Sequence, residues 1–161
     1  MKSFFGIVLL VISFLGPNLS EIRKNFIQAS ETKEIAEKLY NTLENITKES
    51  KPILVAYKGA ASTLKAKHSK GVKQKKSFFK EGAGYLDFSI EKASENIEIR
   101  CLRLSVQEHS PKVLKYKKNI AEDKQFLIDN FQKTTDTAVK KFVKDYVLQS
   151  SLFDATEKKL F

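Results

Sequence analysis

The chain has 161 residues, of which 42% are apolar and 11% aromatic, so it is too hydrophobic to be wholly disordered and long enough to bury a core. It carries 29 basic and 19 acidic residues, for a net charge of +10. Its single cysteine excludes an internal disulfide, so length and composition predict one domain held together by packing alone.

The first twenty residues have the plan of a secretory signal peptide. Lys2 precedes an uncharged run over residues 4–16, and Pro17 then breaks any helix and leaves Ser20 as a small cleavage residue. The run is shorter than the roughly 20 apolar residues that a membrane span needs. We therefore expect residues 1–20 to be a signal peptide, with an uncleaved anchor as the alternative. Residues 21–161 are then one exported domain, periplasmic or secreted.

The remaining chain shows helical periodicity and no alternation typical of strands. Pro52 marks a helix start, residues 119–122 have the arrangement of a capping box that opens a helix at Asn119, and Ser110-Pro111 ends a helix. The predicted helices cover 21–46 with a break near Ser30, 52–68, 76–93, 96–107, 119–132, the stripe from Val139 to Val147, and a short last helix in 152–161. This pattern predicts an all-α fold of six or seven helices, arranged as stacked antiparallel hairpins or an irregular bundle.

Several positions carry expectations about packing. Residues 59–62 are small, which predicts close contact between the 52–68 helix and a neighbour. Residues 69–75 are expected to form a loop, and the connector 111–118 is expected to be anchored by Val113 and Leu114, with Tyr116 as a further candidate anchor. Cys101 falls on an apolar stripe and is expected to be buried.

The hairpin over 76–107 resembles a tetratricopeptide-type helical repeat. Gly82 and Ser89 are small and seven residues apart, and residues 93–100 occupy the place of the turn between helices. Ser94 stands where the repeat has proline, and no second copy aligns. The resemblance implies architecture only.

Residues 98–124 resemble small uncharacterised exported proteins of Bacteroidota-type bacteria, in which a Leu-Arg helix leads to a Ser-Pro-like break. The resemblance implies an exported all-helical protein and no chemistry. The matching positions are Arg100, Leu102, Arg103, Gln107, Pro111, Leu114, Tyr116, Ile120, Asp123 and Lys124.

Arginine is rare in this chain, which has 26 Lys and three Arg. Arg100 and Arg103 lie on adjoining helical turns, where guanidinium geometry is favoured over an ammonium. We expect them to form a structural ion-pair network that ties the 97–107 helix to the 119–132 helix through Glu122 and Asp123. Glu98 and Asp87 are further plausible partners. A clamp for a ligand carboxylate or other anion is the alternative.

A basic cluster over residues 65–80 contains no acidic residue. It is interpreted either as a solvated loop or as an anion-binding surface for phospholipid headgroups, lipopolysaccharide phosphates or another anionic envelope surface. Nucleic acid is disfavoured because arginines and stacking aromatics are not interleaved with the charges. The cluster comprises Lys65, Lys67, His68, Lys70, Lys73, Lys75, Lys76 and Lys80.

No catalytic, metal-binding or cofactor-binding motif is found, and Glu108-His109 is interpreted as a helix end rather than an acid–base pair. The sequence thus predicts a non-enzymatic interaction or structural module without a cofactor, which binds a protein or peptide in a groove between helices. The alternative is a polyanion or envelope-surface binder that uses residues 65–80. A groove favours the first hypothesis, and a continuous lysine surface without a groove favours the second.

Overall fold

The computed structural model describes residues 18–161, so most of the predicted signal peptide lies outside the described residues. The described part contains eight α-helices, one short 3₁₀ helix and no strand, which confirms the all-α class. The helices are α1 (Leu19–Ala29), α2 (Lys33–Thr42), α3 (Pro52–His68), α4 (Val72–Lys92), α5 (Ile97–His109), η1 (Lys112–Leu114), α6 (Ile120–Asn130), α7 (Thr137–Gln149) and α8 (Ala155–Lys158).

The predicted count of six or seven helices was too low. The break near Ser30 separates α1 from α2, and the tail adds α8, which an Asp154 capping box begins. Asn18 caps α1 by accepting hydrogen bonds from the backbone N–H groups of Ser20 and Glu21. The first helix therefore begins at Leu19, two residues before the expected start of the domain.

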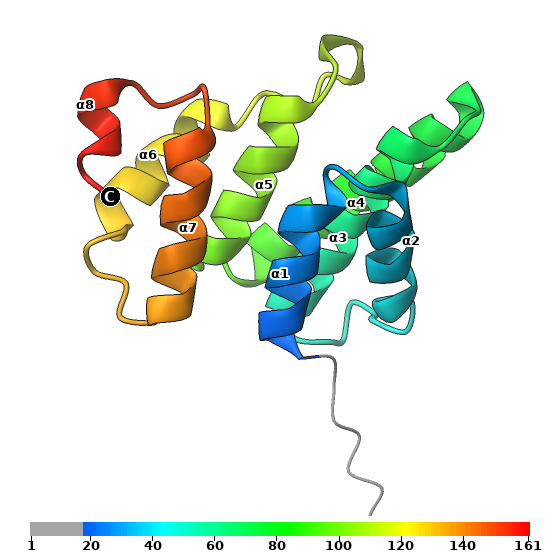
Figure 1. Ribbon diagram of the computed structural model, residues 1–161, viewed down its shortest axis with the longest axis horizontal. Coiled ribbons are helices and arrows are strands. Elements are labelled where there is room, and N and C mark those ends of the chain that lie inside the picture. Colours follow the sequence, from blue (N-terminus) through cyan, green and yellow to red (C-terminus); the bar gives the residue numbers. More distant parts are fainter. Residues whose placement is uncertain (1–17) are drawn as a thin grey trace, which may run out of the picture.

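The α3–α4 hairpin is the most extensive helix pair in the described chain, and Figure 1 shows its closed end projecting at the upper right. A Cβ atom added to Gly59 would lie 2.7 Å from the backbone oxygen of Gly82, so the two backbones touch at this crossing. This agrees with the expectation from residues 59–62. The predicted hairpin of α4 with α5 is also present, but α4 packs more extensively on α3.

The core is centred on α5, which packs against α3, α4, α6 and α7. Ile99, Leu102 and Leu104 are fully buried there, and so is Cys101, as predicted. In Figure 1, α5 lies in the middle of the molecule between α7 and α1. None of the helices within residues 18–161 combines the length and apolar character of a membrane span.

Candidate functional site

The basic cluster lies at the projecting end of the α3–α4 hairpin (Figure 1), and most of it is helical. The predicted loop over 69–75 is wrong, because α4 already begins at Val72 and only Ser69–Gly71 connect the helices. Four of the eight cluster residues thus have fixed positions on α4, three on α3 and one in the turn.

The three cluster residues on α3 face the body of the protein. The Lys65 ammonium lies 3.8 Å from the ring centroid of Tyr40, and Lys67 donates a hydrogen bond of 2.7 Å to the carbonyl oxygen of Ser30. His68 Nε2 is buried and has no hydrogen-bond partner among the described residues. Lys65 and Lys67 thus link α3 to α2 and to the α1–α2 turn, so their ammonium groups already have partners within the protein.

The other five lysines form what we call the basic tip. All five are exposed, and within the described chain none of them forms an ion pair with a carboxylate. Between residues 65 and 80 there is no acidic side chain to neutralise them. The basic tip, defined as Lys70, Lys73, Lys75, Lys76 and Lys80, therefore produces a local positive potential.

A second basic segment, residues 111–118, was not recognised as a site in the sequence. It contains four lysines and no acidic residue, a composition that could have identified it as basic, but the segment is only eight residues long. Val113, predicted to be a buried anchor, is 82% exposed. It lies in η1, and Lys115, which follows this helix, has a left-handed backbone (φ 52°). Only Tyr116 anchors this segment deeply.

Tyr116 attaches the 111–118 segment to α4. Its hydroxyl donates to a carboxylate oxygen of Asp87 at 3.0 Å, and its ring centroid lies 5.6 Å from that of Phe79 in an edge-to-face contact. The second basic segment is thereby fixed beside the helix that carries the basic tip. Figure 1 shows both segments projecting from the upper end of the molecule.

Arg100, Arg103, Glu122 and Asp123 are brought together between α5 and α6. Arg103 donates from Nε and Nη2 to the two carboxylate oxygens of Asp123, at 2.8 and 2.7 Å. Arg100 Nη1 donates to Asp123 at 3.0 Å and also to Glu122. The Asp123 side chain has no exposed surface, so these contacts are internal.

Gln107 completes this cluster in place of the expected capping box at Asn119–Glu122. Its side-chain oxygen accepts a hydrogen bond of 2.9 Å from the backbone N–H of Asn119, and its amide nitrogen donates to Asp123 at 2.9 Å. The Glu122 carboxylate instead binds Arg100 and the side chain of Asn119, and these hydrogen bonds lower the pKa of Glu122.

The remaining arginine also lies in an internal ion pair, which sequence reasoning missed. Arg23 on α1 donates to both carboxylate oxygens of Glu98 at 2.6 and 2.8 Å, and the buried Tyr57 hydroxyl donates to the same carboxylate at 2.6 Å. This cluster joins α1, α3 and α5. Each arginine thus has carboxylate partners within the chain, and the exposed charge is carried by lysine.

Glu108 and His109 do not form an acid–base pair. Glu108 accepts hydrogen bonds from the hydroxyls of Tyr146, Ser150 and Ser151, whereas His109 Nδ1 contacts the carbonyl oxygen of Ser105. Within residues 18–161, no group of three or more His, Cys, Asp or Glu side chains is arranged to hold a metal ion.

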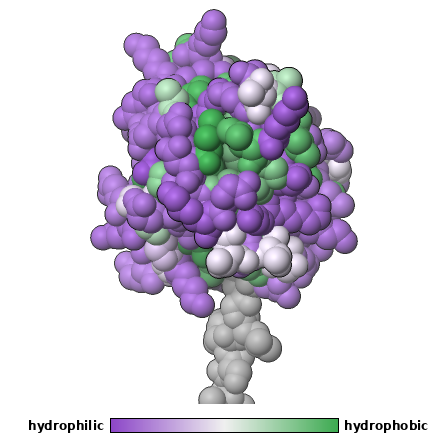
Figure 2. Space-filling view, turned by 90° about the vertical axis from the view of Figure 1, so that its left-hand side faces the viewer, coloured by the Kyte–Doolittle hydropathy of each residue, from purple (hydrophilic) through white to green (hydrophobic). Residues whose placement is uncertain are grey.

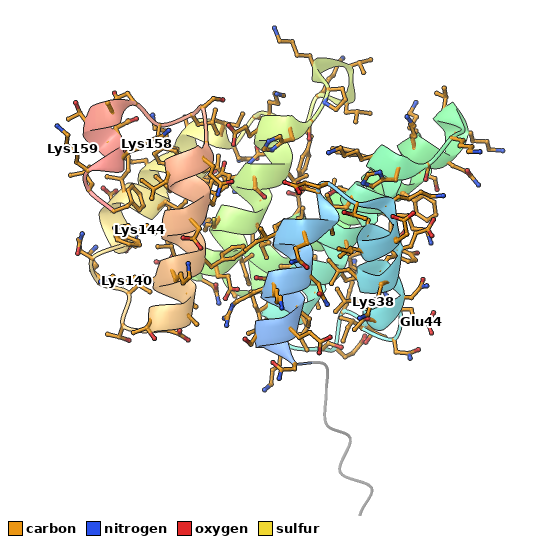
Figure 3. All side chains as sticks on the ribbon, in the orientation of Figure 1. Lys38, Glu44, Lys140, Lys144, Lys158 and Lys159 are labelled. Carbon is orange, nitrogen blue, oxygen red and sulfur yellow. The ribbon has the colours of Figure 1, made fainter. Side chains whose placement is uncertain are left out.

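Two hollows in the described chain are candidates for a peptide groove, and both are open to solvent. One is lined mainly by α4 residues, from Ser77 to Tyr85. The other hollow is lined by Phe131 and Phe161 beside three lysines of α7. It lies on the side of the molecule shown in Figure 2, where hydrophilic residues surround an apolar area. In Figure 3, two of these lysines, Lys140 and Lys144, lie near the left edge, far from the basic tip.

No protein-family model, curated protein or solved structure matches this chain significantly. The resemblances to tetratricopeptide-type repeats and to Bacteroidota-type exported proteins therefore stay predictions.

Proposed function

We propose that this protein binds polyanions or anionic surfaces through its basic tip, and that it has no enzymatic activity. The observation that carries the proposal is a set of five exposed lysines, without carboxylate partners in the described chain, at the projecting end of a rigid hairpin. For an exported protein, phospholipid headgroups or lipopolysaccharide phosphates would be such surfaces.

The stacked-hairpin architecture proposed from the sequence supplies the support for this surface. Consecutive helices pack on one another, α1 on α2, α2 on α3 and α3 on α4. The backbone contact between Gly59 and Gly82 lies about 15 Å along α4 from its start at Val72, at a rise of about 1.5 Å per residue. The first turns of α4 therefore extend beyond the crossing, and their exposed lysines are accessible to a large surface.

The test is binding of long-chain polyphosphate to the protein as salt rises. We expect the affinity to fall by about two orders of magnitude between about 50 and 200 mM NaCl, because each lysine–phosphate contact releases counterions. The triple variant K73Q/K76Q/K80Q should lose about tenfold in affinity at the lower salt concentration.

The matched control removes three exposed lysines elsewhere, as K24Q/K38Q/K159Q. In Figure 3, Lys38 lies at the lower right and Lys159 at the upper left, each apart from the projecting end of the hairpin. Equal losses in the two triple variants would attribute binding to net charge alone and overturn the proposal.

Binding of a protein or peptide partner is the second candidate, and the hollow lined by Phe131 and Phe161 supports it. Apolar rings beside Lys140 and Lys144 favour an acidic peptide with aromatic side chains. A labelled peptide of alternating Phe and Glu should then bind, and K140E should abolish that binding while K73Q/K76Q/K80Q leaves it intact.

A further inference from the structure

We infer that the anionic surface is that of a lipid bilayer, which the protein contacts with two projections at once. This inference rests on the proposed function and adds to it a second basic segment and two apolar contact residues. The first projection is the turn before α4, where Val72 follows Lys70 and Gly71. The second is the 111–118 segment, where Val113 follows Lys112.

The two valines are the most exposed large apolar side chains in the described chain, at 83% for Val72 and 82% for Val113. Each has lysines as near neighbours in the sequence, and neither segment contains an acidic residue. A soluble polyanion offers no environment for an aliphatic side chain. The boundary between headgroups and acyl chains accommodates both groups, because lysine binds the phosphates while the aliphatic side chain enters the apolar layer.

The two valines also lie toward the same side of the molecule. Val72, Lys76, Phe79 and Ala83 follow the i, i+4, i+7 and i+11 spacing of one face of α4. The Tyr116 ring packs on Phe79, and its hydroxyl contacts the carbonyl oxygen of Ala83 at 3.4 Å. The face of α4 that begins with Val72 is therefore the face on which the 111–118 segment is mounted.

The first projection lies close to the part of α4 on which the second segment is attached. Val72 lies about 10 Å along α4 from Phe79, at a rise of about 1.5 Å per residue. Figure 1 shows the 111–118 segment at the top and the hairpin end at the upper right, so both project from the upper part of the molecule. The lysines that would reach the headgroups together are Lys70, Lys73, Lys76 and Lys80 from the basic tip, with Lys112, Lys115 and Lys118 from the second segment.

The experiment is co-sedimentation with phosphatidylcholine vesicles, with and without about 30% phosphatidylglycerol, in parallel with polyphosphate binding. We expect binding only to the anionic vesicles. The variant V72S/V113S should bind them about tenfold more weakly, because two aliphatic side chains no longer enter the interface. Its affinity for polyphosphate should stay at the wild-type value. Both valines are solvent-exposed, so the fold is preserved, which circular dichroism checks.

A fluorescent reporter tests the contact directly, because the chain contains no tryptophan. V72W and V113W should each show a blue-shifted emission when anionic vesicles are added. L160W is the matched control, since Leu160 is half-exposed and lies next to Lys159, outside both projections. Its emission should stay unchanged.

The outcomes separate this inference from the proposed function. Polyphosphate binding without vesicle binding, or vesicle binding that V72S/V113S does not weaken, overturns the bilayer inference and leaves the proposed function standing. Tighter binding of a single-stranded oligonucleotide than of the anionic vesicles also overturns it. Failure to bind either probe overturns both.

Discussion

Asp123 is a buried carboxylate whose two oxygens accept hydrogen bonds from three side chains of α5, namely Arg100, Arg103 and Gln107. A buried charge of this kind is stable only while its partners stay in place. The cluster therefore specifies how α5 and α6 meet, and the tight internal pairing leaves little reason to treat it as a ligand clamp.

The variant R103K tests this assignment. An ammonium cannot reproduce the two parallel hydrogen bonds to Asp123, so we expect the free energy of unfolding in urea to fall by about 2–3 kcal/mol with no ligand present. The exposed Lys141–Asp145 pair is the control, and D145N should cost less than about 0.5 kcal/mol. Equal losses in the two variants would contradict a structural role for the cluster.

Glu108 predicts how stability depends on pH. Partial burial alone would raise its pKa, but hydrogen bonds from Tyr146, Ser151 and Ser150 outweigh burial and lower it. A carboxyl with a lowered folded-state pKa stabilises the fold fully above its unfolded pKa of about 4.3. That contribution is lost as pH falls from there through the lower folded-state pKa.

The variant E108Q should therefore be less stable at pH 7 by about 1–3 kcal/mol, because it leaves donors at the end of α7 unsatisfied. Its deficit relative to the wild type should shrink as the pH is lowered through about 4.3, as the wild-type carboxyl also becomes neutral. Urea titrations across this range measure it. E91Q, at an exposed position, is the control and should leave the free energy of unfolding at pH 7 nearly unchanged.

At the scale of elements, the α3–α4 crossing depends on two glycines. A Cβ atom on Gly82 would lie 2.6 Å from Thr63 Cγ2 and closer still to the carbonyl oxygen of Gly59. Gly84, one turn of α4 away from Lys80, has open space around the same position. Gly82 and Gly84 lie on the same helix, yet replacing each of them with alanine should change the stability of the protein in opposite directions.

We expect G82A to lower the free energy of unfolding by about 1–3 kcal/mol, because α3 and α4 must move apart to make room for the added Cβ atom. G84A should raise it by about 0.5–1 kcal/mol through the helix propensity of alanine. Thermal unfolding followed by circular dichroism measures both. Stabilisation by G82A would contradict the close backbone contact.

The sequence predicted those elements whose signals are local. Pro52 marks the start of α3, and Ser110-Pro111 marks the end of α5. The apolar stripe after Asp136 coincides with α7. The start of α4 was missed because residues 72–77 carry lysines rather than an apolar stripe, and packing on α3 extends the helix.

The same limit applies to the sites. The spacing of Arg100 and Arg103 predicted an ion-pair network, and the structure places Glu122 and Asp123 of α6 within ion-pair distance of them. Glu98, another predicted partner, pairs with Arg23 instead. By contrast, the position of the 111–118 segment depends on Tyr116 packing against α4, and the exposure of Val113 follows no local pattern in the sequence. The second basic segment therefore required the tertiary structure.

At the scale of the whole molecule, internal ion pairs and external charge are separated. Arg23 links α1 to α5, and Arg100 and Arg103 link α5 to α6. Lysines dominate the exposed charge at the hairpin end and in the 111–118 segment. Substitutions in the two proposed contact segments should therefore change binding without changing stability, and substitutions of the arginines should do the reverse.

Because Cys101 is buried, the rate at which its thiol is modified reports how often the core of this protein opens. Only a thiolate reacts with a disulfide reagent, and burial raises the pKa of the Cys101 thiol well above its usual value. The thiol can therefore react only after α5 has separated from the helices around it, and the rate of modification depends on how often this separation occurs. In the unaltered chain, labelling time courses would report how often the centre of the fold comes apart under native conditions.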